Sequence, residues 1–358
     1  MKVVWVGLLE IRSYRTLTLH PEPRLNVLLG PNAQGKTNLL EALGFLVTGR
    51  SFRTSRIAEV PRWGAEAAAI TGELARVEAA GESRRTVRRA LVRGDDGSWQ
   101  ATGEGAPEWA RAIAFGWQDL EIVNGAPGAR RGFIDGFAAR LYPTHAATLV
   151  RYRQILARRN RVLAAHRHEP GLAARLEPWS EQIATVGMEL IARRRRAVAA
   201  LQTELARVWG ALAAGHAKVE VRYRTALGEA AEPAALLEAL ARARAREARL
   251  GQTLVGPHRD DLAIEIDGAD ARTFGSRGQQ RLVALGLRLA EVLPVTEAAG
   301  TAPVLLLDDA LSELDPRGRE LVLREIGAAE QVFLTTPEPL AAAGAAVFHV
   351  DGGGVEAA

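Results

Sequence analysis

The sequence contains no cysteine and no long apolar segment. The absence of cysteine excludes disulfides, cysteine-bound metals and a Cys-x-x-Cys zinc hook, and it is typical of a cytoplasmic protein. No run of about 18 apolar residues is present, so no membrane-spanning helix is predicted. The N-terminus has no basic patch followed by a purely apolar stretch, so no signal peptide is indicated. We therefore predict a cytoplasmic protein without a membrane partner.

Lysine is also scarce, because Lys2, Lys36 and Lys218 stand against a large number of arginines. Lysine and arginine together number 46 against 42 acidic residues, a formal net charge of +4, and the sequence pI is about 9.8. A basic protein of this kind is a candidate for nucleic-acid binding if its arginines cluster. The presence of lysine at position 36, in a chain that otherwise uses arginine, indicates a specific task at that position.

A segment near the N-terminus fits the phosphate-loop pattern G-x-x-x-x-G-K-[ST]. It follows an apolar run at residues 25–29, which predicts a buried strand, and it precedes a helical pattern of leucines from Leu39 onward. Such a loop wraps an anion with its backbone N–H groups, and the helix N-terminus adds a favourable dipole. A chance glycine-rich turn is the alternative, which the agreement of strand, loop and helix disfavours. The predicted nucleotide-binding residues are Gly30, Pro31, Asn32, Ala33, Gln34, Gly35, Lys36, Thr37 and Asn38.

Four side chains have predicted roles in a Mg²⁺-nucleotide site. Lys36 supplies a point charge to the phosphates, and Thr37 supplies a hydroxyl ligand to the metal. Residues 304–307 are an apolar run that ends in Asp308 and Asp309. We predict that Asp308 holds the metal directly or through water and that Asp309 orients or deprotonates the attacking water. The alternative is a buried strand with a polar end.

The pattern along the chain predicts an α/β protein with a helical block in its middle. Strands are expected at residues 3–10, 17–20, 25–29, 67–73, 84–93, 99–102, 112–115, 219–223, 262–266, 304–307 and 332–336, with a hairpin turn at 94–97. Apolar residues at three- and four-residue spacing predict long helices at 145–166 and 172–214. A break near Gly171 between them suggests an antiparallel helical hairpin.

Arginines are concentrated in a few segments of the chain. Arg193 to Arg196 form a continuous run, and the first long helix carries several more arginines. We interpret these runs as solvated helix faces, which is the common role of such charges. For DNA contacts we favour the head over the arm and predict Arg53, Arg56, Arg130 and Arg131 as the contacting residues.

The order of these parts resembles the ABC-type ATPases, and among them the branch with a helical arm inserted in the head. A Ser-x-Gly-Gln helix start lies just before the acidic strand, at Ser276, Arg277, Gly278 and Gln279. The resemblance implies that this helix start caps the γ-phosphate of ATP bound to a second subunit. Two heads would then sandwich two ATP molecules as an ATP-dependent homodimer. The corresponding D-loop residues are Ser312, Glu313, Leu314 and Asp315.

Over nearly its full length the chain resembles the RecF family of bacterial recombination and gap-repair proteins, which are related to the SMC ATPases. Besides the phosphate loop, the resemblance rests on residues 50–54 (Arg-Ser-Phe-Arg-Thr), 130–135 (Arg-Arg-Gly-Phe-Ile-Asp), 256–261 (Gly-Pro-His-Arg-Asp-Asp), 276–280 and 308–315. It implies an ABC/SMC-type ATPase head of mixed sheets and helices, assembled from residues 1–140 and 252–358, with an α-helical arm at 141–251.

The same resemblance implies a function in DNA repair, recombination, replication and the SOS response. The expected activity is a weak, DNA-stimulated ATPase that uses ATP and Mg²⁺ as a switch. Expected partners are double-stranded DNA at gaps or single-strand/double-strand junctions, and RecR and RecO in the loading of recombinase. The location would be the cytoplasm, in association with the nucleoid.

Three positions depart from the usual ABC or RecF pattern. Asp309 stands where ABC ATPases usually have glutamate, one methylene longer, so slow hydrolysis is expected. Thr335 and Thr336 stand where a switch histidine is usual, so a γ-phosphate sensor here would be a hydroxyl. Gln118 lies in Trp-Gln-Asp-Leu where RecF proteins tend to have Pro-Glu-Asp-Leu, and we place it near the metal or the attacking water.

Rival ATPase classes fit the chain less well. The nucleotide-binding subunit of an ABC transporter is the alternative function, but it would have a compact helical subdomain in place of a long arginine-rich helical block. A chromosome-organising SMC protein would need hundreds of residues of coiled coil and a hinge, for which a chain of 358 residues has no room.

Overall fold

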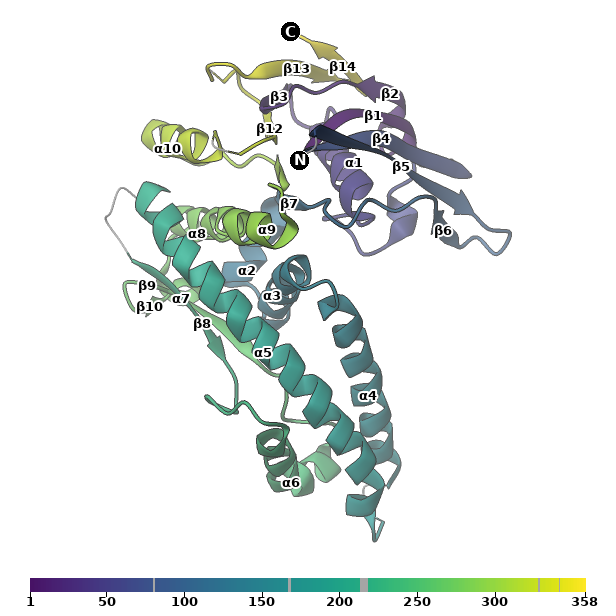
Figure 1. Cartoon of the computed structure of the whole chain (residues 1–358), viewed down its shortest axis with the longest axis vertical. Coiled ribbons are helices and arrows are strands. Elements are labelled where there is room, and N and C mark those ends of the chain that lie inside the picture. Colours follow the sequence, from purple (N-terminus) through teal and green to yellow (C-terminus); the bar gives the residue numbers. More distant parts are fainter. Residues whose placement is uncertain (80, 167–168, 213–217, 328, 341) are drawn as a thin grey trace. The chain divides into compact units, whose positions relative to one another are not determined.

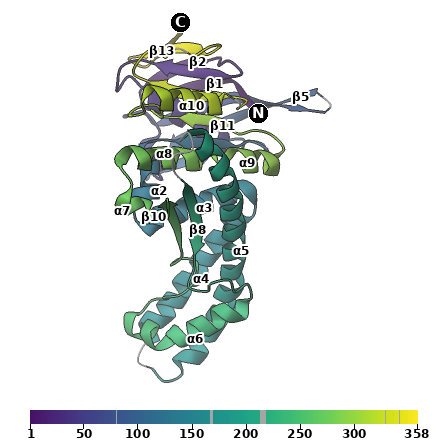
Figure 2. The same cartoon turned by 90° about the vertical axis from the view of Figure 1, so that its left-hand side faces the viewer.

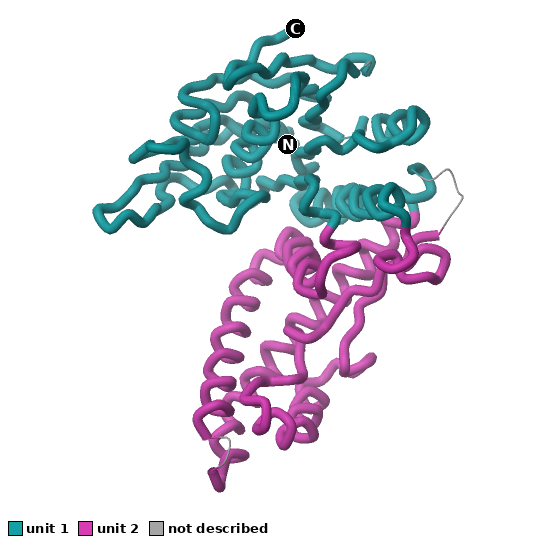
Figure 3. Tube along the Cα trace, turned by 180° about the vertical axis from the view of Figure 1, so that it is seen from behind, with its two compact units in different colours: residues 1–120, 207–216, 276–358 teal, residues 121–206, 217–275 magenta. Residues whose placement is uncertain are grey.

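The computed structural model describes residues 1–79, 81–166, 169–212, 218–327, 329–340 and 342–358. The chain divides into two compact units, coloured teal and magenta in Figure 3. Unit 1 comprises residues 1–120, 207–216 and 276–358, and unit 2 comprises residues 121–206 and 217–275. Unit 1 is therefore assembled from both ends of the sequence.

Unit 1 contains a six-stranded sheet in the order β14-β13-β3-β12-β11-β7. Its strands are β3 (Leu25–Leu29), β7 (Ala112–Phe115), β11 (Val304–Leu307), β12 (Val332–Thr336), β13 (Ala346–Asp351) and β14 (Gly354–Ala357). All pairs are parallel except β13 with β14. β11 and β12 are buried along their whole length, as is usual for parallel strands. Because β3 and β11 run in the same direction, the loop after β3 and the acidic residues after β11 emerge at the same edge.

A second sheet of unit 1 is antiparallel, in the order β2-β1-β4-β5-β6. Its strands are β1 (Lys2–Ile11), β2 (Tyr14–Leu19), β4 (Ala67–Glu78), β5 (Gly81–Arg93) and β6 (Trp99–Thr102). Val87 and Leu91 of β5 are buried. The hairpin turn predicted at residues 94–97 is confirmed, because it joins the paired strands β5 and β6.

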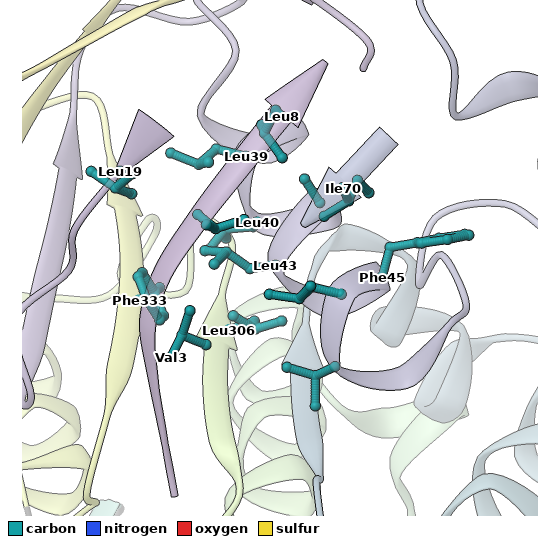
Figure 4. Packing of buried hydrophobic residues seen from close by; sticks show 14 of the residues in the cluster. Val3, Leu8, Leu19, Leu39, Leu40, Leu43, Phe45, Ile70, Leu306 and Phe333 are labelled. Carbon is teal, nitrogen blue, oxygen red and sulfur yellow. The ribbon is translucent and has the colours of Figure 1, made fainter. Parts of the chain in front are cut away.

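Helix α1 (Lys36–Thr48) joins the two sheets through one hydrophobic core. Leu40 and Leu43 of this helix are fully buried in the same cluster as Ile70 of β4, Leu306 of β11 and Phe333 of β12 (Figure 4). Each leucine that is buried in this way contributes about 1.5–3 kcal/mol. The packing fixes the first turn of α1, and with it the loop before it, against both sheets.

Three further helices of unit 1 lie in the C-terminal part of the chain. They are α8 (Arg277–Leu289), α9 (Val292–Ala299) and α10 (Pro316–Ile326). The short 3-10 helices η1 (Ile57–Glu59) and η2 (Trp117–Asp119) also belong to this unit. Val283, Leu285 and Leu289 of α8 are buried, which accounts for the apolar spacing in its sequence.

Unit 2 is built around a helical hairpin of α4 (His145–His166) and α5 (Leu172–Leu212), with α6 (Pro233–Leu250) beside it (Figures 1 and 2). The last residues of α5, from position 207, belong to unit 1. Arg159 of α4 bonds Ser180 of α5, and Thr148 bonds Arg193. As the residue number rises on α4 it falls on α5, so the two helices are antiparallel, as predicted. The predicted last residues of the second helix, 213 and 214, lie outside the described residues.

The rest of unit 2 comprises α2 (Leu120–Asn124), which begins at the last residue of unit 1, α3 (Pro127–Leu141), α7 (Ala271–Phe274) and a three-stranded antiparallel sheet. The sheet has the order β10-β9-β8, with β8 (Val219–Arg224), β9 (Asp261–Ile266) and β10 (Ala269–Asp270). The sequence-based division assigned residues 121–140 and 252–275 to the head, and these residues pack within unit 2. No helix in the described part of the chain is long and apolar enough to cross a membrane.

Candidate nucleotide site

The loop between β3 and α1 needs glycine at two positions. A Cβ on Gly30 would lie 2.2 Å from the carbonyl oxygen of Val350 on β13. Gly35 has a φ of +113°, and its Cβ would lie 2.8 Å from the Ser13 hydroxyl. Larger residues would therefore clash or strain the backbone at both ends of the loop. The two glycines of the sequence pattern allow the loop to curl tightly at the start of α1.

Lys36 directs its charge into this loop. Its Nζ donates to the carbonyl oxygens of Gly30, at 2.5 Å, and Pro31, at 2.7 Å, and the residue is only 8% exposed. Burial lowers the pKa of the Lys36 ammonium, whereas the nearby Asp308 and Asp309 act to raise it. The ammonium is thus a buried positive charge at the loop, the type of group that contacts the β- and γ-phosphates in P-loop NTPases.

Thr37 and Asp308 converge from opposite ends of the chain. Thr37 Oγ1 lies 2.9 Å from both Oδ1 and Oδ2 of Asp308, and Thr335 Oγ1 donates to Oδ1 at 2.9 Å. Burial raises the pKa of the Asp308 carboxyl, and the two hydroxyl hydrogen bonds oppose that change. A buried carboxylate beside a hydroxyl is a hard oxygen donor pair of the kind that Mg²⁺ prefers.

Thr37 and Asp308 supply only part of the ligands of a metal ion, so they fit a cation that takes its remaining ligands from water or from a bound nucleotide. Among the described residues, no group of three or more histidine, cysteine, aspartate or glutamate side chains could hold a metal alone. Mg²⁺ is usually bound by one or two protein groups and completes its octahedron with waters and substrate phosphates. Thr37 and Asp308 therefore match a Mg²⁺-nucleotide complex better than a metal cage made only of protein.

Asp309 follows Asp308 in an unusual backbone conformation. Its φ is +52°, in the left-handed region, and its backbone N–H donates to Thr335 Oγ1 at 2.8 Å. The Asp309 carboxylate is 51% exposed, whereas Asp308 is buried. Thr335 thereby links the two aspartates, bonding the side chain of one and the backbone of the other.

These residues line one pocket of about 340 Å³. Its walls come from the phosphate loop, the first turn of α1, the ends of β11 and β12, η2 and α8. The lining residues are Asn32, Ala33, Gly35, Lys36, Thr37, Asn38, Arg53, Trp117, Arg281, Asp308, Asp309, Thr335 and Pro337. The pocket is highly polar and brings an ammonium, two carboxylates and two guanidinium groups together.

Two predicted participants point elsewhere. Gln118 donates through Nε2 to the carbonyl oxygen of Phe52 at 2.8 Å, and the neighbouring Trp117 lines the pocket in its place. Thr336 exchanges hydrogen bonds with the backbone of Glu338, so its hydroxyl closes a turn. Of the two threonines expected as a switch, Thr335 is the one that lies at the carboxylates.

The predicted signature residues form an exposed helix start. Ser276 Oγ accepts from the backbone N–H of Gln279 at 3.3 Å, and Gln279 Oε1 accepts from the N–H of Ser276 at 2.9 Å. This capping box orders the first turn of α8. Arg277 and Gly278 are exposed, and a Cβ on Gly278 would meet no atom within 4 Å. None of these four residues lines the pocket around Lys36.

The predicted D-loop residues connect Asp309 to α10. Ser312 Oγ donates to the Asp309 carbonyl oxygen at 3.0 Å, and Asp315 Oδ1 caps α10 by accepting from the Gly318 N–H at 2.6 Å. Glu313 has a φ of +61°, and Leu314 follows it before the cap. The segment is a tight turn in which the Ser312 hydroxyl bonds the backbone just after β11.

The four predicted DNA-contacting arginines differ in accessibility. Arg53 donates to Asn38 Oδ1 at 2.7 Å and lines the nucleotide pocket, and Arg56 is 82% exposed, 3.6 Å from Glu59. In unit 2, Arg130 is buried in a bidentate pair with Asp261, at 2.7 and 2.8 Å, and Arg131 donates to the Asp260 carbonyl oxygen. Arg56 is therefore the most accessible member of the set.

The interpretation of the arginine runs as solvated is wrong for Arg194, and also for Arg159 of α4, which is 1% exposed and pairs with Glu247 at 2.7 Å. Arg194 is only 2% exposed and forms a bidentate pair with Asp135 of α3, with both N–O distances 2.8 Å. Although burial acts to raise it, hydrogen bonds from His145 and Arg194 hold the pKa of Asp135 below its ordinary value. A buried ion pair of this kind is strongly destabilising to break, so Arg194 serves the fold of unit 2.

The Gly-Pro-His-Arg-Asp-Asp segment is tied into the same network. His258 Nε2 lies 3.0 Å from the carbonyl oxygen of Thr253 and must donate to it, so Nδ1 accepts from the Tyr152 hydroxyl at 2.7 Å. Burial lowers the pKa of His258 to about 4. Arg194 also donates to the Pro257 carbonyl oxygen at 2.6 Å, so the segment is held by α4 and α5.

Sequence reasoning missed Arg281 of α8. Its Nη2 donates to the Asp309 carbonyl oxygen and to Ser312 Oγ, and its side chain lines the nucleotide pocket. The available signal was an arginine directly before the apolar positions of a helix, where a buried residue is expected. That signal shows burial but not the partner, because Asp309 lies 28 positions away.

The amino-acid sequence is similar to a family model and to known bacterial proteins. A family model described as the RecF/RecN/SMC N terminal domain matches residues 3–348. DNA replication and repair protein RecF of Synechococcus sp. (strain JA-3-3Ab) is 36% identical over 354 residues, covering 94% of this chain and 91% of the relative. The RecF protein of Heliobacterium modesticaldum is 34% identical, covering 99% and 98% of the two chains.

Two solved structures have folds similar to that of this chain. The structure of the recombination mediator protein RecF with ATP in the RecFOR pathway superposes with a TM-score of 0.87 at 27% identity, covering 99% of this chain and 97% of that one. An Smc head domain from Pyrococcus furiosus has a TM-score of 0.55 at 17% identity, covering 99% and 95%, and this likeness concerns the fold alone. The predicted ABC/SMC-type head with an inserted helical arm is confirmed as the fold class.

Proposed function

Because the chain belongs to the RecF family, within the broader RecF/RecN/SMC group, we propose that it binds ATP and Mg²⁺ in the pocket around Lys36. The single observation that carries the proposal is the meeting of Lys36, Thr37 and Asp308 in one pocket. The RecF structure solved with ATP supports the choice of nucleotide. Membership of this family also argues against the alternative function as a nucleotide-binding subunit of an ABC transporter.

The charged and hydroxyl-bearing residues of the pocket have separate tasks in this proposal. The backbone N–H groups of the loop and the Lys36 ammonium bind the β- and γ-phosphates, and Thr37 and Asp308 hold the metal. Bound Mg²⁺ neutralises charge on the phosphates. Arg53 lines the same pocket and adds a further positive charge beside Asn38.

Hydrolysis is proposed to be slow. The Asp309 carboxylate takes a proton from water while the water oxygen bonds to the γ-phosphorus and the bond to the departing ADP oxygen breaks. The short aspartate side chain reaches less far than the usual glutamate would. Gln118 would have to leave the Phe52 carbonyl oxygen before its amide could approach this water.

The signature helix suggests how ATP controls assembly. The first turn of α8 is ordered by Ser276, and Arg277 and Gly278 are exposed beside it. A helix N-terminus with free backbone N–H groups favours a bound anion. We assign this anion to the γ-phosphate of ATP on a second copy, so that ATP forms a homodimer and hydrolysis releases it.

The biological role follows from the relatives named DNA replication and repair protein RecF. We assign to this chain ATP-dependent binding of double-stranded DNA at gaps or junctions, cooperation with RecR and RecO in loading recombinase, and a location at the nucleoid. Unit 1 would be the ATPase head, and the α4–α5 hairpin would be the arm. The ATPase would be stimulated by DNA, because DNA and the ATP-bound dimer would stabilise each other.

Co-sedimentation tests this function directly. The protein is mixed with gapped duplex DNA or with liposomes, each with ATP and Mg²⁺, with ADP, or without nucleotide. We expect sedimentation with DNA in ATP and none with liposomes. Lys36→Met, which removes the buried charge, should lower ATP affinity by about 10- to 100-fold and abolish the effect of ATP. Binding of liposomes in place of DNA, or parental ATP affinity of Lys36→Met, would contradict the proposal.

A further inference from the structure

The backbone of Asp309 is held in an uncommon conformation. A non-glycine residue at φ +52° has a free-energy cost that its surroundings offset. Two side chains do so from opposite sides of the residue. Thr335 Oγ1 accepts from the Asp309 N–H at 2.8 Å, and the Arg281 guanidinium donates to the Asp309 carbonyl oxygen. The direction of the Asp309 carboxylate therefore depends on both of these contacts.

Arg281 is built into this position. It is 8% exposed, with its guanidinium carbon 6.0 Å from the ring centroid of Phe115, the last residue of β7. Its Nη2 also donates to Ser312 Oγ at 2.6 Å and lies 3.6 Å from Asp309 Oδ2. Its Nε is buried and has no hydrogen-bond partner among the described residues. The arginine thus leaves a buried N–H donor unused while its Nη2 bonds the Asp309 backbone and the D-loop.

Because Arg281 belongs to α8, its hydrogen bond to Asp309 also connects Asp309 to the start of that helix. The helix starts at the capping box of Ser276, and Arg281 lies in its second turn. A helix moves as a unit over such a short distance, because its backbone hydrogen bonds are continuous. A displacement of the exposed start of α8 is therefore transmitted to the Asp309 backbone through Arg281.

We propose that Arg281 is a positioning residue for ATP hydrolysis. When the start of α8 binds a second copy of the chain, Arg281 orients the Asp309 carboxylate of its own subunit. The inference rests on the proposed ATPase function and dimer. It explains why an arginine is buried beside a phosphate pocket with its charge directed to a carbonyl oxygen and a carboxylate. Hydrolysis in one subunit then follows the docking of that subunit on its partner.

The test separates binding from turnover. In Arg281→Met, which keeps an apolar contact with Phe115 but has no donor, we expect ATP affinity and ATP-dependent self-association to stay within about threefold of the parent. The turnover number should fall by about 10- to 100-fold. Arg281→Lys, which retains a charged donor, should recover part of that loss. A fluorescent ATP analogue, light scattering and phosphate release measure the three quantities.

Controls make each outcome decisive. Arg324→Met changes an exposed arginine of α10 in the same unit and should match the parent in every assay. Arg281→Lys carries the test alone if thermal melting shows that Arg281→Met does not fold. Parental turnover in a folded Arg281 variant, or an equal loss of affinity and turnover, overturns the positioning role. If the parent itself binds ATP but releases no more phosphate than Asp309→Asn, the proposed ATPase fails, and this role fails with it.

Discussion

Thr37 Oγ1 lies 2.9 Å from each carboxylate oxygen of Asp308, although the two residues are 271 positions apart in the chain. In the sheet, β12 alone separates β3 from β11, and all three strands are parallel. The loop proposed to bind the phosphates and the carboxylate proposed to hold the metal therefore come from opposite ends of the sequence. Neither end of the chain can form the site without the other.

The first prediction concerns Asp309→Asn. Asparagine has the same shape and tolerates the left-handed conformation of this residue, so the fold and the metal ligands Thr37 and Asp308 should be unaffected. An amide cannot accept the proton of the attacking water. We expect ATP binding at the parental affinity, a loss of turnover of about 100-fold or more, and accumulation of the ATP-bound dimer.

Size-exclusion chromatography with ATP and Mg²⁺ measures the dimer, and phosphate release measures turnover. The same column run with ADP is the control and should show monomer. A variant that elutes as monomer in ATP and still hydrolyses ATP at the parental rate would show that Asp309 has another role.

The second prediction concerns Ser276→Arg at the start of α8. The bulky cation would occupy the place of the partner's γ-phosphate, while the pocket around Lys36 lacks Ser276 and should be intact. We expect parental ATP affinity without ATP-dependent dimers. Ser276→Ala is the matched control, because it also loses the helix cap, at about 1 kcal/mol, but adds no bulk. Dimers of Ser276→Arg at the parental ATP concentration would argue against a shared site.

The sequence was sufficient to predict those parts of the candidate site that are formed by residues close together in the chain. The phosphate loop, its strand and its helix are continuous in the chain, so the curl at Gly30 and Gly35 could be predicted from the spacing. Asp308 could be predicted because a buried parallel strand reads as an apolar run that ends at its polar edge. The positions of Lys36, Thr37 and Asp308 in one pocket agree with that prediction.

The sequence was insufficient where a charge depends on a distant partner. Arg194 stands in a run of four arginines, yet its partner Asp135 lies 59 positions away. A helical pattern shows which residues share a face but not what packs against that face. Gln118 shows the same limit, because its neighbour Trp117 lines the pocket while its own amide bonds Phe52, 66 positions distant.

The third prediction concerns the pH dependence of stability in unit 2. Burial lowers the pKa of His258 to about 4, from an ordinary value of 6.5. Between these values the unfolded chain binds a proton that the folded chain does not, so stability falls as the pH falls from 6.5 to 4. The expected loss is about 2 kcal/mol, less than the full shift would give because the side chain is partly exposed.

Urea unfolding at several pH values measures this slope. His258→Gln, which does not titrate, should be less stable at pH 7 but should have a flatter dependence between pH 6.5 and 4. His20→Gln is the control, because it removes an exposed histidine of unit 1 without touching the network. An unchanged slope in His258→Gln would show that other groups cause the acid sensitivity.

The fourth prediction concerns DNA binding and salt. The proposed ATP-dependent dimer would join two weak basic surfaces into one, so binding of duplex DNA at moderate salt should require ATP. Each phosphate that is neutralised releases counterions, and the logarithm of affinity should fall against the logarithm of salt with a slope of about 0.9 per phosphate contact. Fluorescence anisotropy over a salt series measures both effects. Equal affinity with and without ATP would contradict the proposal that DNA binds to the ATP-dependent dimer.

Charge reversal can decide between head and arm because the structure shows which arginines are safe to change. Arg194 is unsuitable, since its loss would leave Asp135 buried without its partner, and Arg53 lines the nucleotide pocket. Arg56 of unit 1 and Arg151 of α4 are both exposed, so Arg56→Glu and Arg151→Glu form a matched pair. We expect Arg56→Glu to weaken binding more and to reduce the salt slope by about one contact. A larger loss in Arg151→Glu, with parental binding in Arg56→Glu, would assign the main DNA surface to the arm.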